Sequence, residues 1–160
     1  MLLPLYKKLS EKLFHLPFVG FVFVILILSY VLVLPFALFD DGMAHPISER
    51  HIAYQIITGC LLAPVLETLL FQVLPIHIFT KKWIKNRTLA IFISGALFGL
   101  THYYSWQYIL WTCVIGLLYA WAYLNYHERQ GFKKVFWAIT IAHALRNTVA
   151  LVAGVLSQNG

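Results

Sequence analysis

Five apolar stretches, separated by short polar segments, organise the chain. They cover residues 16–39, 51–79, 88–104, 105–126 and 135–156. An α-helix needs about 20 apolar residues to cross a bilayer, and only the third stretch is on the short side of that length. The pattern predicts an all-α fold, a polytopic membrane bundle of about five transmembrane helices, in a single membrane domain over residues 1–160.

The composition agrees with a membrane protein. Hydrophobic residues make up 61% of the chain and charged residues 11%, whereas a soluble domain is about 45–50% apolar and about 25% charged. The net charge of +6 does not indicate a nucleic acid partner, because the Lys and Arg residues gather in short loops, as orientation signals do. Basic segments alternate with the acidic loop at 40–50, which places the N-terminus in the cytoplasm.

Four polar residues interrupt the apolar stretches: Glu67, His102, His143 and Asn147. An acid at the bilayer centre costs about 2.5–3.5 kcal/mol and is tolerated mainly where it has a function. Counted inward from the basic loops at about 1.5 Å per residue, the four lie roughly 14–22 Å deep. Small residues share their helix faces and would let the helices approach closely. We therefore predict one polar cluster built from three helices.

Such a cluster suits the hydrolysis of an acyl or peptide bond. Glu67 can act as a general base on water, with one histidine orienting that water. His143 and Asn147 stand one helical turn apart and can direct two donors at an oxyanion. Alternatively, Glu67, His102 and His143 can hold a metal ion such as Zn²⁺, which would activate the water. No HExxH motif supports the metal alternative.

Three motifs resemble those of the CPBP family (CAAX proteases and bacteriocin-processing enzymes), also called the Abi family. That family carries EExxxR, FxxxH and HxxxN in this order. Residues 98–102 read FGLTH and residues 143–147 read HALRN, so both match the second and third motifs. Residues 67–72 read ETLLFQ in the first position. The resemblance covers roughly residues 61–150, which we expect to form the catalytic core.

The resemblance implies an intramembrane endopeptidase, a hydrolase of the bacterial cytoplasmic membrane that cuts a peptide or membrane-protein substrate. It implies Glu67 as the base and His102 as a residue that helps to activate water, with Phe98 in a supporting role. His143 and Asn147 would be oxyanion donors, or His143 a metal ligand. The family is commonly labelled metalloprotease, yet a metal-free glutamate mechanism has also been argued, so Zn²⁺ stays an open alternative. Because five spans make a minimal core, a homodimer is one expected way of closing the cavity.

The first motif departs from the family pattern. Thr68 stands in place of the second Glu, and Gln72 in place of the Arg. These positions are i and i+4 on a helix, where Glu and Arg would form an ion pair. Because both charges are absent together, we predict a neutral hydrogen-bonding pair, exchanged as a unit, and retained chemistry. Arg146 is predicted to contact Glu67 and so replace part of the lost arginine.

Two other classes of function stay open. The departure in the first motif is compatible with a catalytically degenerate homologue, which would bind a peptide in the same cavity as an immunity or scaffold factor. A small transporter or proton relay would also use buried Glu and His. Transporters usually show internal repeats or paired broken helices, and the pattern reveals neither.

Overall fold

A computed structural model describes residues 11–39, 50–82 and 86–158 of the chain, and these are helical almost throughout. The main helices are α2 (Phe18–Val31), a continuous helix over Ile52–Lys82, α6 (Arg87–Leu100), α7 (Trp106–Gln130) and α8 (Phe132–Gln158). Among the described residues, four helices are long and apolar enough to cross a membrane, and α6, with 14 residues, is shorter. The prediction of an all-α polytopic bundle is confirmed.

The expected ends of the third and fourth spans differ from the structure by four residues each. The third was expected to reach residue 104, but α6 stops at Leu100, and a short turn leads to α7. The side chain of Ser105 begins α7 by accepting a hydrogen bond from the backbone N–H of Tyr108 at 3.1 Å. The fourth expected span ended at residue 126, but α7 continues to Gln130 and is followed by Gly131, whose φ of 80° is left-handed and favours glycine.

The first expected span is not one uniform helix. Its last residues form a tighter 3₁₀ helix, η1 (Leu34–Phe39), which follows α2. The basic N-terminal residues 1–10, residues 40–49 of the acidic loop, and Lys85 lie outside the described residues. The cytoplasmic location of the N-terminus therefore stays a prediction, as does the division of the chain into a single domain with a core at 61–150.

The helix over Ile52–Lys82 alternates between α-helical and wider π-helical turns. Its segments are α3 (Ile52–Tyr54), η3 (Gln55–Leu62), α4 (Ala63–Glu67), η4 (Thr68–Val73), α5 (Leu74–His77) and η5 (Ile78–Lys82), in which the η segments are π-helical. Pro64 and Pro75 stand at the starts of α4 and α5. Proline cannot donate the helical hydrogen bond, and each proline follows a π segment. Such π turns occur often at functional sites, and Glu67 lies between two of them.

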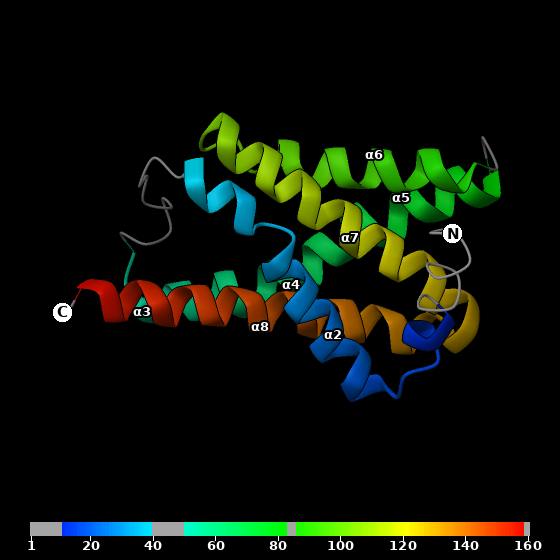
Figure 1. The fold of residues 1–160 in the computed structure, drawn as a ribbon, viewed down its shortest axis with the longest axis horizontal. Helices are drawn as coiled ribbons and strands as arrows, with labels where there is room; N and C mark the ends of the chain where they lie inside the picture. Colours follow the sequence, from blue (N-terminus) through cyan, green and yellow to red (C-terminus); the bar gives the residue numbers. More distant parts are fainter. Residues whose placement is uncertain (1–10, 40–49, 83–85, 159–160) are drawn as a thin grey trace.

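The helices form two halves that the Ile52–Lys82 helix joins (Figure 1). Its first segments lie beside α8, and its last segments pack against α6. The helices α6 and α7 form a hairpin in the other half, and α2 crosses both α7 and α8. Residues far apart in the sequence, on α4, α6 and α8, are thereby brought to the interior between the two halves.

Glycines set the close approach of α6 to α7. A Cβ atom on Gly99 would lie 2.1 Å from Sγ and 2.7 Å from the backbone nitrogen of Cys113, so no side chain fits there. A Cβ atom on Gly95 would lie 2.9 Å from the backbone nitrogen of Leu117. This agrees with the expected role of small residues in membrane helix packing. The tight hairpin fixes where α6 ends, and with it the position of the turn that carries His102.

Candidate active site

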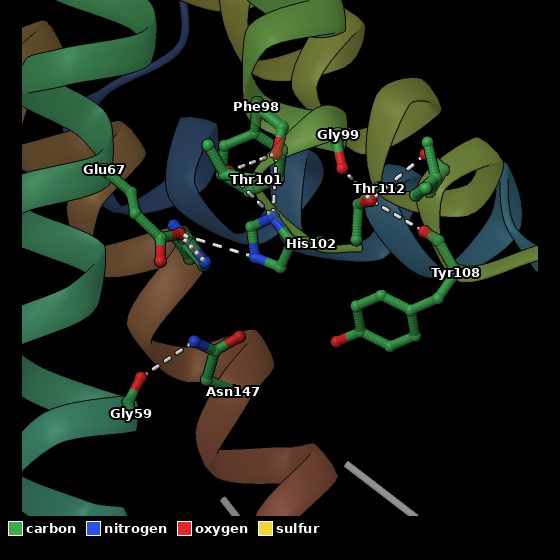
Figure 2. Close-up of polar contacts among 11 residues, drawn as sticks. Gly59, Glu67, Phe98, Gly99, Thr101, His102, Tyr108, Thr112 and Asn147 are labelled. Atoms are coloured by element: carbon green, nitrogen blue, oxygen red, sulfur yellow. Dashed lines mark hydrogen bonds and ion pairs between the residues drawn. The ribbon is translucent and has the colours of Figure 1, made fainter. Parts of the chain in front are cut away.

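Glu67 and two histidines converge from three separate elements. The Oε2 atom of Glu67, on α4, lies 3.6 Å from Nε2 of His143, on α8. It lies 3.9 Å from Nε2 of His102, in the turn after α6 (Figure 2). These distances are longer than a direct hydrogen bond, but one water molecule can bridge such groups. The three side chains are only 22%, 5% and 14% exposed, respectively, so the cluster is partly shielded from solvent and lipid.

The imidazole of His102 is held by the backbone of its own motif. Its Nδ1 atom lies 2.7 Å from the carbonyl oxygen of Phe98. Because a carbonyl only accepts hydrogen bonds, Nδ1 must carry the proton in this arrangement. In the neutral ring, Nε2 then presents a lone pair toward Glu67. That nitrogen is suited to accept a hydrogen bond from a water molecule held beside the carboxylate.

The imidazole of His143 is held by aromatic packing. Its ring centroid lies 5.5 Å from that of Phe98 and 5.4 Å from that of Tyr119. Its Nδ1 atom is buried and has no hydrogen-bond partner among the described residues. Phe98 is 2% exposed, and its ring also lies 4.8 Å from that of His102. The phenylalanine of the FxxxH motif is therefore a wall shared by both histidines.

Asn147 links α8 to the helix that carries Glu67. Its Nδ2 atom donates a hydrogen bond to the carbonyl oxygen of Gly59 at 2.8 Å (Figure 2). In the π register of η3, the N–H of Ala63 bonds to the carbonyl of Thr58. The next donor in that register would be Pro64, which has no N–H, so the Gly59 carbonyl is left for the asparagine. One N–H of the Asn147 amide therefore holds α8 against η3. The role of Asn147 as an oxyanion donor stays a prediction.

Thr68 and Gln72 are fully buried, so neither faces lipid. The predicted hydrogen bond between them is absent, because Thr68 Oγ1 and both polar atoms of the Gln72 side chain have no hydrogen-bond partner among the described residues. Both residues lie in η4, which is π-helical. The wider turn of a π-helix, with i→i+5 hydrogen bonds, displaces positions i and i+4 from the stacking they have in an α-helix.

The predicted contact between Arg146 and Glu67 is wrong, because the described residues contain no ion pair between them. The guanidinium of Arg146 lies 4.9 Å from the ring centroid of Tyr30 on α2 and 5.5 Å from that of Trp111 on α7. The Tyr30 hydroxyl also donates to the backbone carbonyl of Arg146 at 3.0 Å. One residue along an α-helix turns the side chain by about 100°. Arg146 therefore faces α2 and α7, whereas its neighbour Asn147 faces η3.

Two tyrosines near the cluster were not expected there from the sequence. Tyr108 lies close in sequence to Tyr103 and Trp106, which are 79% and 64% exposed. The ring of Tyr108, however, lies 6.0 Å from that of His102. Tyr119, fully buried beside His143, lies in an apolar stretch that gives no signal. Ser105 is a signal in the sequence for the position of Tyr108. Serine often begins a helix, and a helix that begins at Ser105 places Tyr108 in its first turn.

The residues present were also compared with a metal site. Glu, His and His are ligands that zinc uses, and the Phe98 carbonyl supplies His102 with the outer partner that a metal-bound histidine usually has. His143 has no such partner at Nδ1. The described residues contain no group of three His, Cys, Asp or Glu arranged to hold a metal ion. Zn²⁺ held by Glu67, His102 and His143 therefore stays a prediction, and we derive no step through a metal ion.

A family model described as type II CAAX prenyl endopeptidase Rce1-like matches residues 49–149, more than half of the chain. The chain belongs to the Rce1-like family. The matched region contains all three motifs and the whole of the cluster around Glu67. Membership in the Rce1-like family confirms the predicted resemblance to CAAX proteases. No curated protein and no solved structure matches the chain.

Family membership and the apolar helices together identify an integral membrane protein of the CAAX protease type. At this level, the predicted class of enzyme and its membrane setting are confirmed. The family match does not assign the roles of Glu67, His102, His143 and Asn147, which rest on the geometry above.

Proposed function

We propose that this Rce1-like protein is an intramembrane endopeptidase in which Glu67 activates water for attack on a peptide carbonyl. One observation carries the proposal: Oε2 of Glu67 lies within 4 Å of the Nε2 atoms of both motif histidines, at 3.6 and 3.9 Å. That oxygen is buried and has no hydrogen-bond partner among the described residues. A carboxylate oxygen free to accept a proton, flanked by two imidazoles, suits general base catalysis.

The proposed reaction begins with a water molecule held between Glu67 and His102. Glu67 takes one proton from the water, and the lone pair on Nε2 of His102 accepts a hydrogen bond from the other hydrogen. The water oxygen bonds to the carbonyl carbon, and the carbonyl electron pair moves to oxygen. When the carbon–nitrogen bond breaks, the departing amine takes the proton from Glu67. His143 helps to orient the carboxylate through Nε2.

The family description suggests the first substrate to test, a peptide that ends in a prenylated CAAX sequence. We also propose the cytoplasmic membrane of a bacterium as the setting, with the N-terminus inside. The alternation of basic and acidic loops supports this orientation. A prenylated peptide would then reach the site from the cytoplasmic leaflet.

The test uses the full chain, purified into lipid nanodiscs, and a fluorogenic peptide with a farnesylated CAAX terminus. We expect cleavage by the wild type and a kcat lowered by about 10²–10⁴-fold in Glu67→Gln, since a general base typically contributes that much. Glu128→Gln is the matched control, because Glu128 pairs with Arg87 away from the cluster and is exposed. Its kcat should stay at the wild-type value.

Two outcomes would overturn the proposal: no cleavage of prenylated or unprenylated peptides by the wild type, or wild-type cleavage by Glu67→Gln. Peptide binding without cleavage would support the scaffold alternative. A parallel sample with chelator tests the metal alternative. Unchanged cleavage supports the glutamate mechanism, and a loss that Zn²⁺ restores supports the metalloprotease.

A further inference from the structure

The proposed hydrolysis needs a donor for the oxyanion, and the motif residues supply fewer than expected. Asn147 donates to the Gly59 carbonyl, and His102 donates through Nδ1 to the Phe98 carbonyl. A proton on Nε2 of His143 would point toward the Glu67 carboxylate, 3.6 Å away. A water-derived tetrahedral intermediate carries a full negative charge on oxygen, and enzymes stabilise it with prepositioned donors. The second N–H of Asn147 stays available, and a further donor near the cluster would share the charge with it.

We infer that Tyr108 is a further catalytic residue, whose hydroxyl donates a hydrogen bond to the oxyanion. The inference rests on the proposed function. The ring centroid of Tyr108 lies 6.0 Å from that of His102. Figure 2 shows the hydroxyl at the end of the ring nearest to His102 and Asn147, on the opposite side of His102 from Glu67. A peptide carbonyl bound beside Glu67 and His102 with its oxygen turned toward this hydroxyl would receive the hydrogen bond in the tetrahedral intermediate.

The position of Tyr108 is fixed by its surroundings. Its backbone N–H donates to the Ser105 side chain at 3.1 Å, and the Thr112 hydroxyl donates to its carbonyl at 2.7 Å. Its ring packs against those of Tyr104 and Trp111, each with a centroid 5.3 Å away. A donor that is already in place needs no reorganisation during the reaction, which is the property that makes an oxyanion hole effective.

Arg146 adds a positive charge to the aromatic group that contains Tyr108. It lies over the ring of Trp111, which in turn packs against Tyr108. Since Arg146 forms no ion pair with Glu67 in the described part of the chain, its charge is not neutralised there. It therefore favours donation by Tyr108 and the negative charge that forms in front of it, acting as a positioning residue.

The electrons and protons balance without a proton transfer from Tyr108. As the water oxygen bonds to carbon, the carbonyl electron pair moves to oxygen, and the Tyr108 O–H donates a hydrogen bond but keeps its proton. As the carbon–nitrogen bond breaks, that electron pair re-forms the carbonyl. The amine leaves with the proton that Glu67 took from the water.

Tyr108→Phe tests the inference, because it removes the hydroxyl and keeps the ring. We expect kcat for the farnesylated peptide to fall by about 10²–10³-fold, the usual effect of losing one oxyanion donor, with KM unchanged. Tyr103→Phe is the matched control, since Tyr103 lies in the turn before α7 and is 79% exposed. Its kcat should match that of the wild type.

A second readout separates catalysis from structure. A peptide phosphonate mimics the tetrahedral oxyanion, so Tyr108→Phe should weaken its binding about as much as kcat falls. Binding of the uncleaved substrate peptide, measured in the Glu67→Gln background, should not change with Tyr108→Phe. A merely structural tyrosine would weaken both ligands equally, and that result would overturn the inference.

The inference and the proposed function fail in different ways. If Glu67→Gln is inactive and Tyr108→Phe cleaves at the wild-type rate, the inference is wrong and the proposed function stands. If the wild type neither cleaves peptides nor binds the phosphonate more tightly than the uncleaved peptide, the proposed function is wrong and the inference fails with it.

Discussion

The two motif histidines reach Glu67 in different ways. His102 lies in a turn between two helices, and a backbone carbonyl holds its ring through Nδ1 at 2.7 Å. His143 lies within the 27-residue helix α8, and aromatic rings hold it by packing. Both present Nε2 within 4 Å of the same carboxylate oxygen, at 3.9 and 3.6 Å. One orientation depends on where α6 ends, and the other on the side chains around α8.

This difference predicts which changes disturb each histidine. A change that separates α6 from α7 moves the turn and therefore His102, while α8 keeps its place. A change in the aromatic wall loosens His143 first, because His143 has no hydrogen bond at Nδ1 among the described residues. Phe98 belongs to both environments, since it supplies the carbonyl for His102 and a ring beside His143.

The largest effect is expected for Phe98→Ala. Removing a ring that is 2% exposed leaves a cavity between the histidines, and such a change typically lowers the free energy of unfolding by about 3–5 kcal/mol. Unfolding in mixed SDS micelles measures the loss, and peptide cleavage should fall with it. Phe92→Ala, on the same helix but 58% exposed, is the control and should have little effect. Equal effects of the two variants would contradict a shared wall at Phe98.

A smaller loss is expected for Gly99→Ala. The added methyl would meet both the side chain and the backbone of Cys113, and overpacking of this kind costs about 1–3 kcal/mol. The turn should shift, so cleavage should decrease more than the lost stability alone explains. Gly154→Ala provides the comparison, because its Cβ would have no neighbour within 4 Å. Unchanged stability and cleavage in Gly99→Ala would show that close packing does not fix His102.

The smallest effect on stability is expected for Asn147→Ala. It leaves the Gly59 carbonyl without its partner, and a typical hydrogen bond contributes about 1 kcal/mol. Thr148→Ala is the control, since the Thr148 hydroxyl is exposed and donates to the Ala144 carbonyl within its own helix. A kcat lowered by about 10²–10³-fold with unchanged stability would show that Asn147 is mainly an oxyanion donor. That result would contradict a structural role for its hydrogen bond to Gly59.

Much of the fold was predictable because membrane helices leave a strong signal in sequence. Apolar stretches located the helices, and three motifs located Glu67, His102 and His143, which the structure brings together. The wider turns around Pro64 were not predictable, since they depend on the register of hydrogen bonds along the helix. Those turns decide that Asn147 meets Gly59 and that Thr68 and Gln72 do not pair.

Side-chain direction accounts for the other differences. The prediction for Arg146 relied on its closeness to Asn147 in sequence, but adjacent residues on a helix point to different sides. Tyr108 cannot be told from its exposed neighbours in the sequence, because composition alone does not separate the lipid-facing side of a helix from the buried one. Packing between α6 and α7 decides which side of each helix is buried. The spacing of the glycines in the sequence indicates only that the two helices can approach closely.

Chemical rescue of Glu67→Ala tests the central claim, that Glu67 is the general base, most directly. The variant removes the carboxylate and leaves room for a small external one. We expect it to cleave the farnesylated peptide about 10²–10⁴-fold more slowly than the wild type, and its rate to rise as formate is added. Cleavage by Glu67→Ala at the wild-type rate without formate would contradict the account.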